Sequence, residues 1–279
     1  MTRVSPDWLA LRESADAAAR SAELVDQLRA YLVRTTPGPL VIRDLGCGTG
    51  SMGRWLAGRL PGPQHWILHD RDADLLAIAV DSLPRKAADG SPVTAEARVG
   101  DLTTLTAGDL ADTSLVVASA LLDLLTGDEV DGLAGACVDA GCPALLLLSV
   151  VGLVGVTPAD PLDAEITTAF NAHQRRFING RWLLGPDAVK VTTKAFERRG
   201  VTTAVRPSPW RLAAEQGELT MEWLRGWVSA AAEQWPDFAG QSEAYLRRRL
   251  DMCLAGELRV MVQHQDLLAL PAPTGGDPA

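Results

Sequence analysis

The sequence predicts an α/β protein with a doubly wound, seven-stranded, mostly parallel sheet. Short apolar runs alternate with stretches of helical periodicity from residue 40 onward. A glycine-rich turn follows the first run. The acids Asp44, Asp70 and Asp101 lie at the ends of the first three predicted strands. We expect N-terminal helices and helical insertions to form a roof over the edge of the sheet where these strands end.

Residues 5–34 are predicted to be helical, because Ser5-Pro6 is a typical start and leucines recur at helical spacing. Arg12, Asp16 and Arg20 are four residues apart and so share one face of a helix. Two interpretations stay open. The three side chains form a surface ladder of ion pairs, or the segment is a lid whose Arg20 meets a carboxylate of a bound cofactor.

The first strand runs into a turn with Gly46, Gly48 and Gly50, preceded by Asp44. Glycines let the backbone turn sharply and approach a ligand closely. A dinucleotide site has Gly-x-Gly-x-x-Gly, and its helix start receives a pyrophosphate. A carboxylate such as Asp44 would repel that group but suits a ligand with an amino group or another cation. The spacing therefore disfavours a nicotinamide cofactor.

The stretch Asp44-Leu45-Gly46-Cys47-Gly48-Thr49-Gly50 resembles motif I of the class I, small-molecule S-adenosylmethionine-dependent methyltransferases. The resemblance covers residues 35–151 well, and 186–206 and 258–270 by topology alone. It implies S-adenosyl-L-methionine as the cofactor and a last strand that runs antiparallel. It also implies that the methionine part is held by Asp44, Gly46, Cys47, Gly48 and Gly50.

Strands are predicted at 65–70 and 93–99, each followed by an acid-containing turn. A carboxylate at the tip of the second strand can accept hydrogen bonds from both ribose hydroxyls. The resemblance implies this role for Asp70, places Arg71 beside the adenine, and assigns the exocyclic amine to Asp101 and a ring nitrogen to the backbone of Leu102.

The fourth strand, 114–119, ends near the reacting methyl group if ligands lie at the carboxyl ends of parallel strands. Ser119 is therefore expected at the cofactor. Asp123 follows among leucines, where an acid is unfavourable unless it is used or paired. It is a candidate general base, or alternatively the cap of the helix predicted at 128–140.

A fifth, fully apolar strand is predicted at 143–151, followed by a mobile-looking connection at 152–158. His173 lies in a predicted roof helix at 161–177, among polar residues, and is the second candidate base. The alternative for His173 is an ordinary surface position. Further helices are predicted at 187–199, 217–235 and 239–255, and strands at 201–206 and 258–270.

These elements predict three parts of the chain. Residues 1–36 form a helical lid, residues 37–270 form the methyltransferase domain, and residues 271–279 form a disordered tail. The domain carries helical insertions at 152–185 and 208–256, which we expect to choose the substrate. Their tryptophans favour a partly apolar or aromatic substrate.

The 279 residues carry a net charge of −9, which disfavours nucleic acid as a partner. No apolar run is long enough to cross a membrane, and the N-terminus does not have the pattern of a signal peptide. Four scattered cysteines show neither metal-ligand nor disulfide spacing. We therefore expect a cytoplasmic protein without a metal; a homodimer stays open.

The combined prediction is direct, in-line methyl transfer from S-adenosylmethionine to a small organic molecule, at oxygen, nitrogen or carbon. One alternative is a catalytically silent protein that binds the same cofactor and assists a partner. A nicotinamide-dependent oxidoreductase is a weaker alternative, because the glycine spacing and Asp44 disfavour a cofactor with a pyrophosphate.

Overall fold

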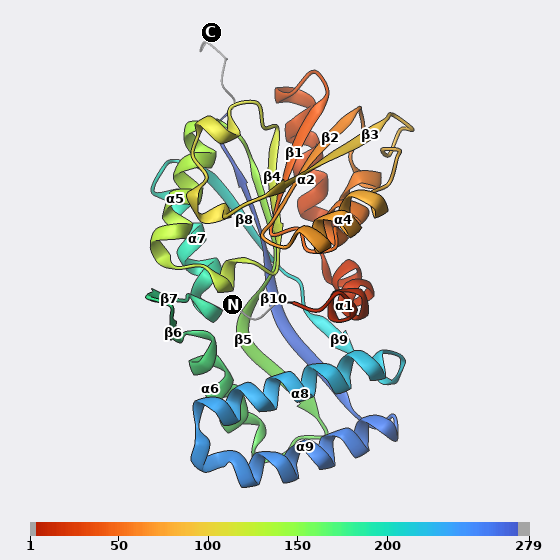
Figure 1. The fold of residues 1–279 in the computed structure, drawn as a ribbon, viewed down its shortest axis with the longest axis vertical. Coiled ribbons are helices and arrows are strands. Elements are labelled where there is room, and N and C mark those ends of the chain that lie inside the picture. Colours follow the sequence, from red (N-terminus) through yellow and green to blue (C-terminus); the bar gives the residue numbers. More distant parts are fainter. Residues whose placement is uncertain (1–3, 273–279) are drawn as a thin grey trace.

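The computed structural model describes residues 4–272, and most of their strands form one large twisted sheet (Figure 1). Along the sheet the strands follow the order β3-β2-β1-β4-β5-β10-β8. Their bounds are β1 Leu40–Leu45, β2 Gln64–Asp70, β3 Val93–Val99, β4 Leu115–Ser119, β5 Ala144–Thr157, β8 Thr202–Pro207 and β10 Arg259–Leu270. The short β9, Trp210–Leu212, pairs with the far end of β10.

Strand direction confirms the predicted fold class. Strands β1 to β5 pair in parallel, whereas β10 runs antiparallel to both β5 and β8. A parallel sheet whose last strand in sequence runs antiparallel, between the two strands that precede it in the sheet, is the class I methyltransferase fold. The carboxyl ends of β1, β2 and β4 meet at one edge, where such sheets bind ligands.

Helices cover both faces of the sheet, which is why β4 and β5 are continuous apolar runs. Leu145 and Leu147 pack on one face, and Leu146 packs on the other. The first face is covered by α2 (Ala22–Thr35), α3 (Ser51–Leu56) and α4 (Ala73–Ser82), and the second by α5 (Gly127–Asp139) and α7 (Ala188–Glu197).

Strands β5 and β10 are longer than the other strands of the sheet and continue together into a lower layer of helices (Figure 1). The mobile connection predicted at 152–158 is wrong, because β5 runs to Thr157. Leu148 and Gly152 adopt left-handed backbone angles at two irregularities of the β5–β10 pairing, and such bulges bend a strand. The lower layer contains α6 (Asp163–Gln174), α8 (Gly217–Gln234) and α9 (Ala239–Leu254), packed with β9 around its own apolar core.

The segment predicted to be helical over 5–34 consists of two helices, α1 (Pro6–Ala19) and α2. Arg20 is extended between them. The Ser21 hydroxyl caps α2, and its N–H donates to Asp266 Oδ2 at 2.7 Å. That buried carboxylate also accepts from the backbone N–H of Leu148 and the hydroxyl of Ser208. One carboxylate therefore holds the α1–α2 corner, the bend of β5 and the link from β8 to β9.

A small hairpin of β6 (Phe177–Ile178) and β7 (Arg181–Trp182) was not predicted. Among the described residues, no helix is long and apolar enough to span a membrane. Most of the predicted tail, residues 273–279, lies outside the described residues.

Candidate active site

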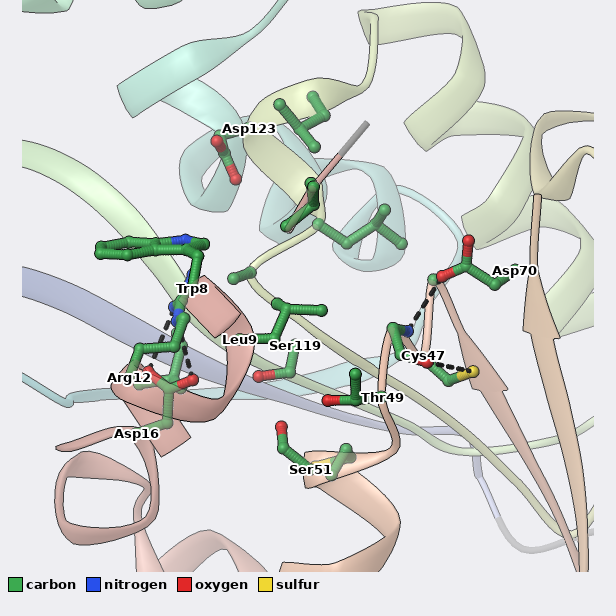
Figure 2. A pocket seen from close by; sticks show the side chains of 18 of the residues that line it. Trp8, Leu9, Arg12, Asp16, Cys47, Thr49, Ser51, Asp70, Ser119 and Asp123 are labelled. Atoms are coloured by element: carbon green, nitrogen blue, oxygen red, sulfur yellow. Dashed lines mark hydrogen bonds and ion pairs between the residues drawn. The ribbon is translucent and has the colours of Figure 1, made fainter. Parts of the chain in front are cut away.

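A cavity of about 880 Å³ opens at the carboxyl ends of β1, β2 and β4. It extends between α1 and the bent part of β5 and β10 (Figure 2). Of the predicted site residues, nine line it: Asp44, Gly46, Cys47, Gly48, Asp70, Arg71, Leu102, Ser119 and Asp123. Arg20, Gly50, Asp101 and His173 do not. We call the part beside the glycine turn the polar half, and the part between α1, α6, α8, β5 and β10 the apolar half.

The glycine turn brings bare backbone to the cavity. Gly46, Gly48 and Gly50 all adopt left-handed angles, with φ of 63°, 54° and 85°, which other residues rarely tolerate. Gly50 does not line the cavity, and its role is packing. A Cβ on Gly50 would lie 3.0 Å from the Cα of Ala79, so glycine lets α3 and α4 approach.

Asp44 is the most unusual titratable group of the polar half. Its side chain is buried, and neither carboxylate oxygen has a hydrogen-bond partner within residues 4–272. Burial raises the pKa of Asp44 to about 8, and nearby Asp70 adds to this, while the charge of Arg20 opposes it. An unpaired buried carboxylate is costly unless a cationic group meets it.

Asp70 stands at the tip of β2, across the turn from Asp44. Its Oδ2 accepts from the Gly48 N–H at 2.9 Å, and its Oδ1 accepts from the Asp72 N–H at 3.0 Å. Each carboxylate oxygen has a second lone pair, so both can still accept from hydroxyl groups. The turn therefore orients Asp70 as a bidentate acceptor that faces the cavity.

Arg20 reaches the edge of the cavity through two serines. Its Nη2 donates to the hydroxyls of Ser51 and Ser119, each at 3.1 Å, and its Nε has no partner in the described chain. Burial lowers its pKa, while Asp16 and Asp44 oppose that shift. The guanidinium thus lies behind two cavity hydroxyls and supplies positive charge next to Asp44.

The two residues expected to contact the adenine, Asp101 and Leu102, lie differently in the structure. Leu102 lines the cavity, but Asp101 forms an ion pair with Arg71 (Nη2–Oδ2 2.7 Å) and bonds with Thr103. These contacts hold the pKa of Asp101 at about 2. Asp101 therefore does not line the cavity, and its contact with an adenine amine stays a prediction.

Asp123 lies on a short 3-10 turn, Leu122–Leu124, after β4, and lines the cavity. It does not cap the next helix, because Thr126 does so in a capping box with Glu129. Figure 2 shows Asp123 and Asp70 on opposite sides of the cavity. Burial raises the pKa of Asp123 to about 6, which leaves it mostly ionised at neutral pH yet able to take a proton.

His173 is not brought to the cavity. Its Nε2 lies 3.2 Å from Glu233 Oε2 on α8, and its Nδ1 lies 3.2 Å from Arg176 Nη1. Burial and Arg176 lower its pKa. These contacts give His173 a place between α6 and α8, outside the candidate site.

Three tryptophans, Trp8, Trp210 and Trp223, give the apolar half its aromatic lining. Its remaining walls include Leu148, Val150, Val154, Phe170 and Val262. Its charges are paired, since Arg12 donates to Asp16 at 2.9 and 3.1 Å and Trp210 Nε1 donates to Asp16 at 2.9 Å. Arg12 and Asp16 thus form the ion pair that the ladder interpretation expects, but the pair is buried at the cavity and does not lie on the surface.

Sequence reasoning missed most of these residues, because they come from segments between positions 8 and 262 that share no motif. Only the aromatic content of the insertions pointed to them. His264 was also missed; it lines the cavity from β10 and is 3 % exposed. Among described residues, no cluster of three or more His, Cys, Asp or Glu side chains has a metal-binding arrangement.

No family model matches this chain, and no curated protein matches it. Solved structures with a similar fold include a cyclopropane synthase from Mycobacterium tuberculosis, at 15% identity and a TM-score of 0.49 over 95% of this chain and 94% of that one. A SAM-dependent methyltransferase from Geobacter sulfurreducens, in complex with S-adenosyl-L-homocysteine, matches at 15% identity and 0.43 over 98% and 100%. A putative sarcosine dimethylglycine methyltransferase from Galdieria sulphuraria matches at 11% and 0.44 over 95% and 97%. The fold assignment rests on the strand order of this chain.

Proposed function

We propose that this protein is an S-adenosylmethionine-dependent methyltransferase that acts on a small organic molecule. The observation that carries the proposal is Asp44, a buried carboxylate without a partner in the described chain, at a glycine turn that exposes backbone to a cavity. A ligand with a cationic group at this point would stabilise the ionised form of Asp44 and so bind there favourably. It disfavours a pyrophosphate, which would bring negative charge to the same place.

The remaining groups of the polar half fit the same cofactor. We propose that Asp44 binds the ammonium group of the methionine part, while Ser51 and Ser119, backed by Arg20, bind its carboxylate. Asp70 accepts from the ribose hydroxyls, and Leu102 covers the adenine. When bound, this cofactor supplies a methyl group already activated on a sulfonium.

The chain then has two tasks. The apolar half excludes water and orients the acceptor, which supplies much of the rate of an in-line transfer. Asp123 takes the proton that an O–H or N–H acceptor loses as its new bond to carbon forms. Asp123 replaces His173 in this role, since only Asp123 lines the cavity.

Calorimetric titration with S-adenosylmethionine and S-adenosylhomocysteine tests the proposal. We expect micromolar binding to the wild type, about 100-fold weaker binding to Asp44→Asn, and a clear loss in Asp70→Ala. Asp26→Asn, an exposed acid on α2, is the control and should bind like the wild type. Absence of binding by either ligand would overturn the proposal, as would a thermal shift with a nicotinamide cofactor alone.

A further inference from the structure

The imidazole of His264 is a polar group of the apolar half that the proposed reaction does not use. It lines the cavity, yet it is almost fully buried, and its ring lies 5.3 Å from that of Trp210. Its Nδ1 has no hydrogen-bond partner among residues 4–272. A buried nitrogen left without a partner costs free energy, so its position against the cavity points to a ligand.

His264 is neutral at neutral pH. Burial, followed by the charge of Arg12, lowers its pKa to about 3, while contacts of the ring with the backbone of Val262 and Ser208 act the other way. A neutral imidazole has one donor and one acceptor nitrogen, and the tautomer decides which is which. A hydroxyl group satisfies Nδ1 in either tautomer, because it can both donate and accept. A carboxylate or an ammonium satisfies only one.

His264 and Asp123 lie at separate places along the sheet. His264 pairs with Val150 on β5, and β5 pairs with β4, the strand that leads to Asp123. Strand β5 therefore lies between β4 and β10, which carries His264, so a ligand that reaches both groups must be elongated. The walls between them are apolar, including Val150, Val262 and Phe170.

We propose that the methyl acceptor is an elongated, mostly apolar aromatic molecule with a methyl-accepting group at Asp123 and a hydroxyl at the other end that hydrogen-bonds His264 Nδ1. This inference rests on the proposed function, because it takes Asp123 as the reacting end. His264 is then a specificity-determining residue, which selects acceptors without taking part in proton transfer. The tryptophans in the walls, Trp8, Trp210 and Trp223, favour flat rings over flexible chains.

A matched pair of small molecules tests this. 4,4′-Dihydroxybiphenyl carries a hydroxyl at each end of an elongated aromatic frame, and 4-hydroxy-4′-methylbiphenyl lacks one of the two. Their binding is measured by calorimetry on protein loaded with S-adenosylhomocysteine, for the wild type, His264→Leu and His264→Asn. Leucine removes the polar atom, whereas asparagine can present an amide near the position of Nδ1.

We expect the wild type to bind the dihydroxy compound about tenfold more tightly than the methyl compound. The ratio should fall to about one in His264→Leu and recover at least in part in His264→Asn, with unchanged affinity for S-adenosylhomocysteine in all three. A wild-type ratio near one, an unchanged ratio in His264→Leu, or no binding of either biphenyl would overturn the inference.

The two proposals fail separately. If S-adenosylhomocysteine does not bind the wild type, the proposed function fails, and the biphenyl ratio is measured on the unloaded protein. If it binds but the ratio does not depend on His264, only the further inference fails.

Discussion

The two halves of the cavity solve the problem of buried charge in opposite ways. In the polar half, Asp44 has no partner in the described chain and keeps an elevated pKa. In the apolar half, Asp16 is fully engaged by Arg12 and Trp210. A buried charge that the protein neutralises itself serves the fold, whereas one that it leaves open is available to a ligand. The contrast separates binding charge from structural charge without knowledge of the ligand.

The largest effect should come from Asp123→Asn, which tests whether Asp123 is the catalytic base. The amide cannot take a proton, so we expect the turnover number to fall about 100-fold or more, with cofactor affinity unchanged. In the wild type the rate should rise with pH through about 6, the pKa of Asp123. Product analysis by mass spectrometry across pH 5–8 measures both. A methyl transfer rate that keeps its size and pH profile in the variant would show that no base is needed.

The unpaired carboxyl group of Asp44 should also affect how the free energy of unfolding depends on pH. Its folded pKa of about 8 lies far above the ordinary 3.8, so the folded state favours the protonated form. The resulting stabilisation is complete below pH 4 and is lost as pH rises toward 8. Asparagine does not titrate, so the free energy of unfolding of Asp44→Asn should rise relative to that of the wild type between about pH 4 and pH 8. Urea unfolding of both proteins without ligand measures this difference. A difference that stays constant with pH would mean that Asp44 is paired in solution.

Asp16, the paired charge of the apolar half, should affect the stability of the fold and not the binding of the cofactor. Trp210→Phe keeps the ring but removes the N–H that donates to Asp16. We expect the free energy of unfolding to fall by about 1–2 kcal/mol, with cofactor affinity within twofold of the wild type. Trp235→Phe, at a more exposed position, is the matched control. A large loss of cofactor affinity in Trp210→Phe would break the distinction between the halves.

The smallest effect is expected for His173→Gln. His173 contacts Glu233 and Arg176 and does not line the cavity. We expect methyl transfer and cofactor binding to change less than twofold, in contrast to the Asp123 variant. Steady-state kinetics on both variants makes the comparison, and a loss of tenfold or more would return His173 to the reaction.

The polar half could be predicted because its residues are local in sequence. A strand, a glycine turn and a helix follow one another, so the chain itself places Asp44, Gly46 and Gly48 together. Asp70 follows at the tip of the neighbouring strand, in register with the first. Such sites need only correct secondary structure and the rule for parallel sheets.

The apolar half could not be predicted in the same way. Trp8, Trp210 and His264 meet because β5 bends, and the bend depends on a left-handed Leu148 whose N–H is held by Asp266. No local pattern announces a positive φ at a leucine inside an apolar run. The break between α1 and α2 has the same origin, since Asp266 also binds Ser21. Long-range contacts decided these features.

Helix α1 has a kinetic consequence. It supplies Leu9, whose Cδ1 would lie 3.0 Å from a Cβ on Gly48, and also Trp8 and Arg12 of the apolar half. Glu13 fixes the same helix to Arg54 on α3 (Oε2–Nη2 2.6 Å). One helix therefore borders both halves of the cavity, so a single movement of α1 would open both at once. Under the proposed function, we expect the rate of that movement to set an upper limit on turnover that improved chemistry at the reacting atoms would not raise.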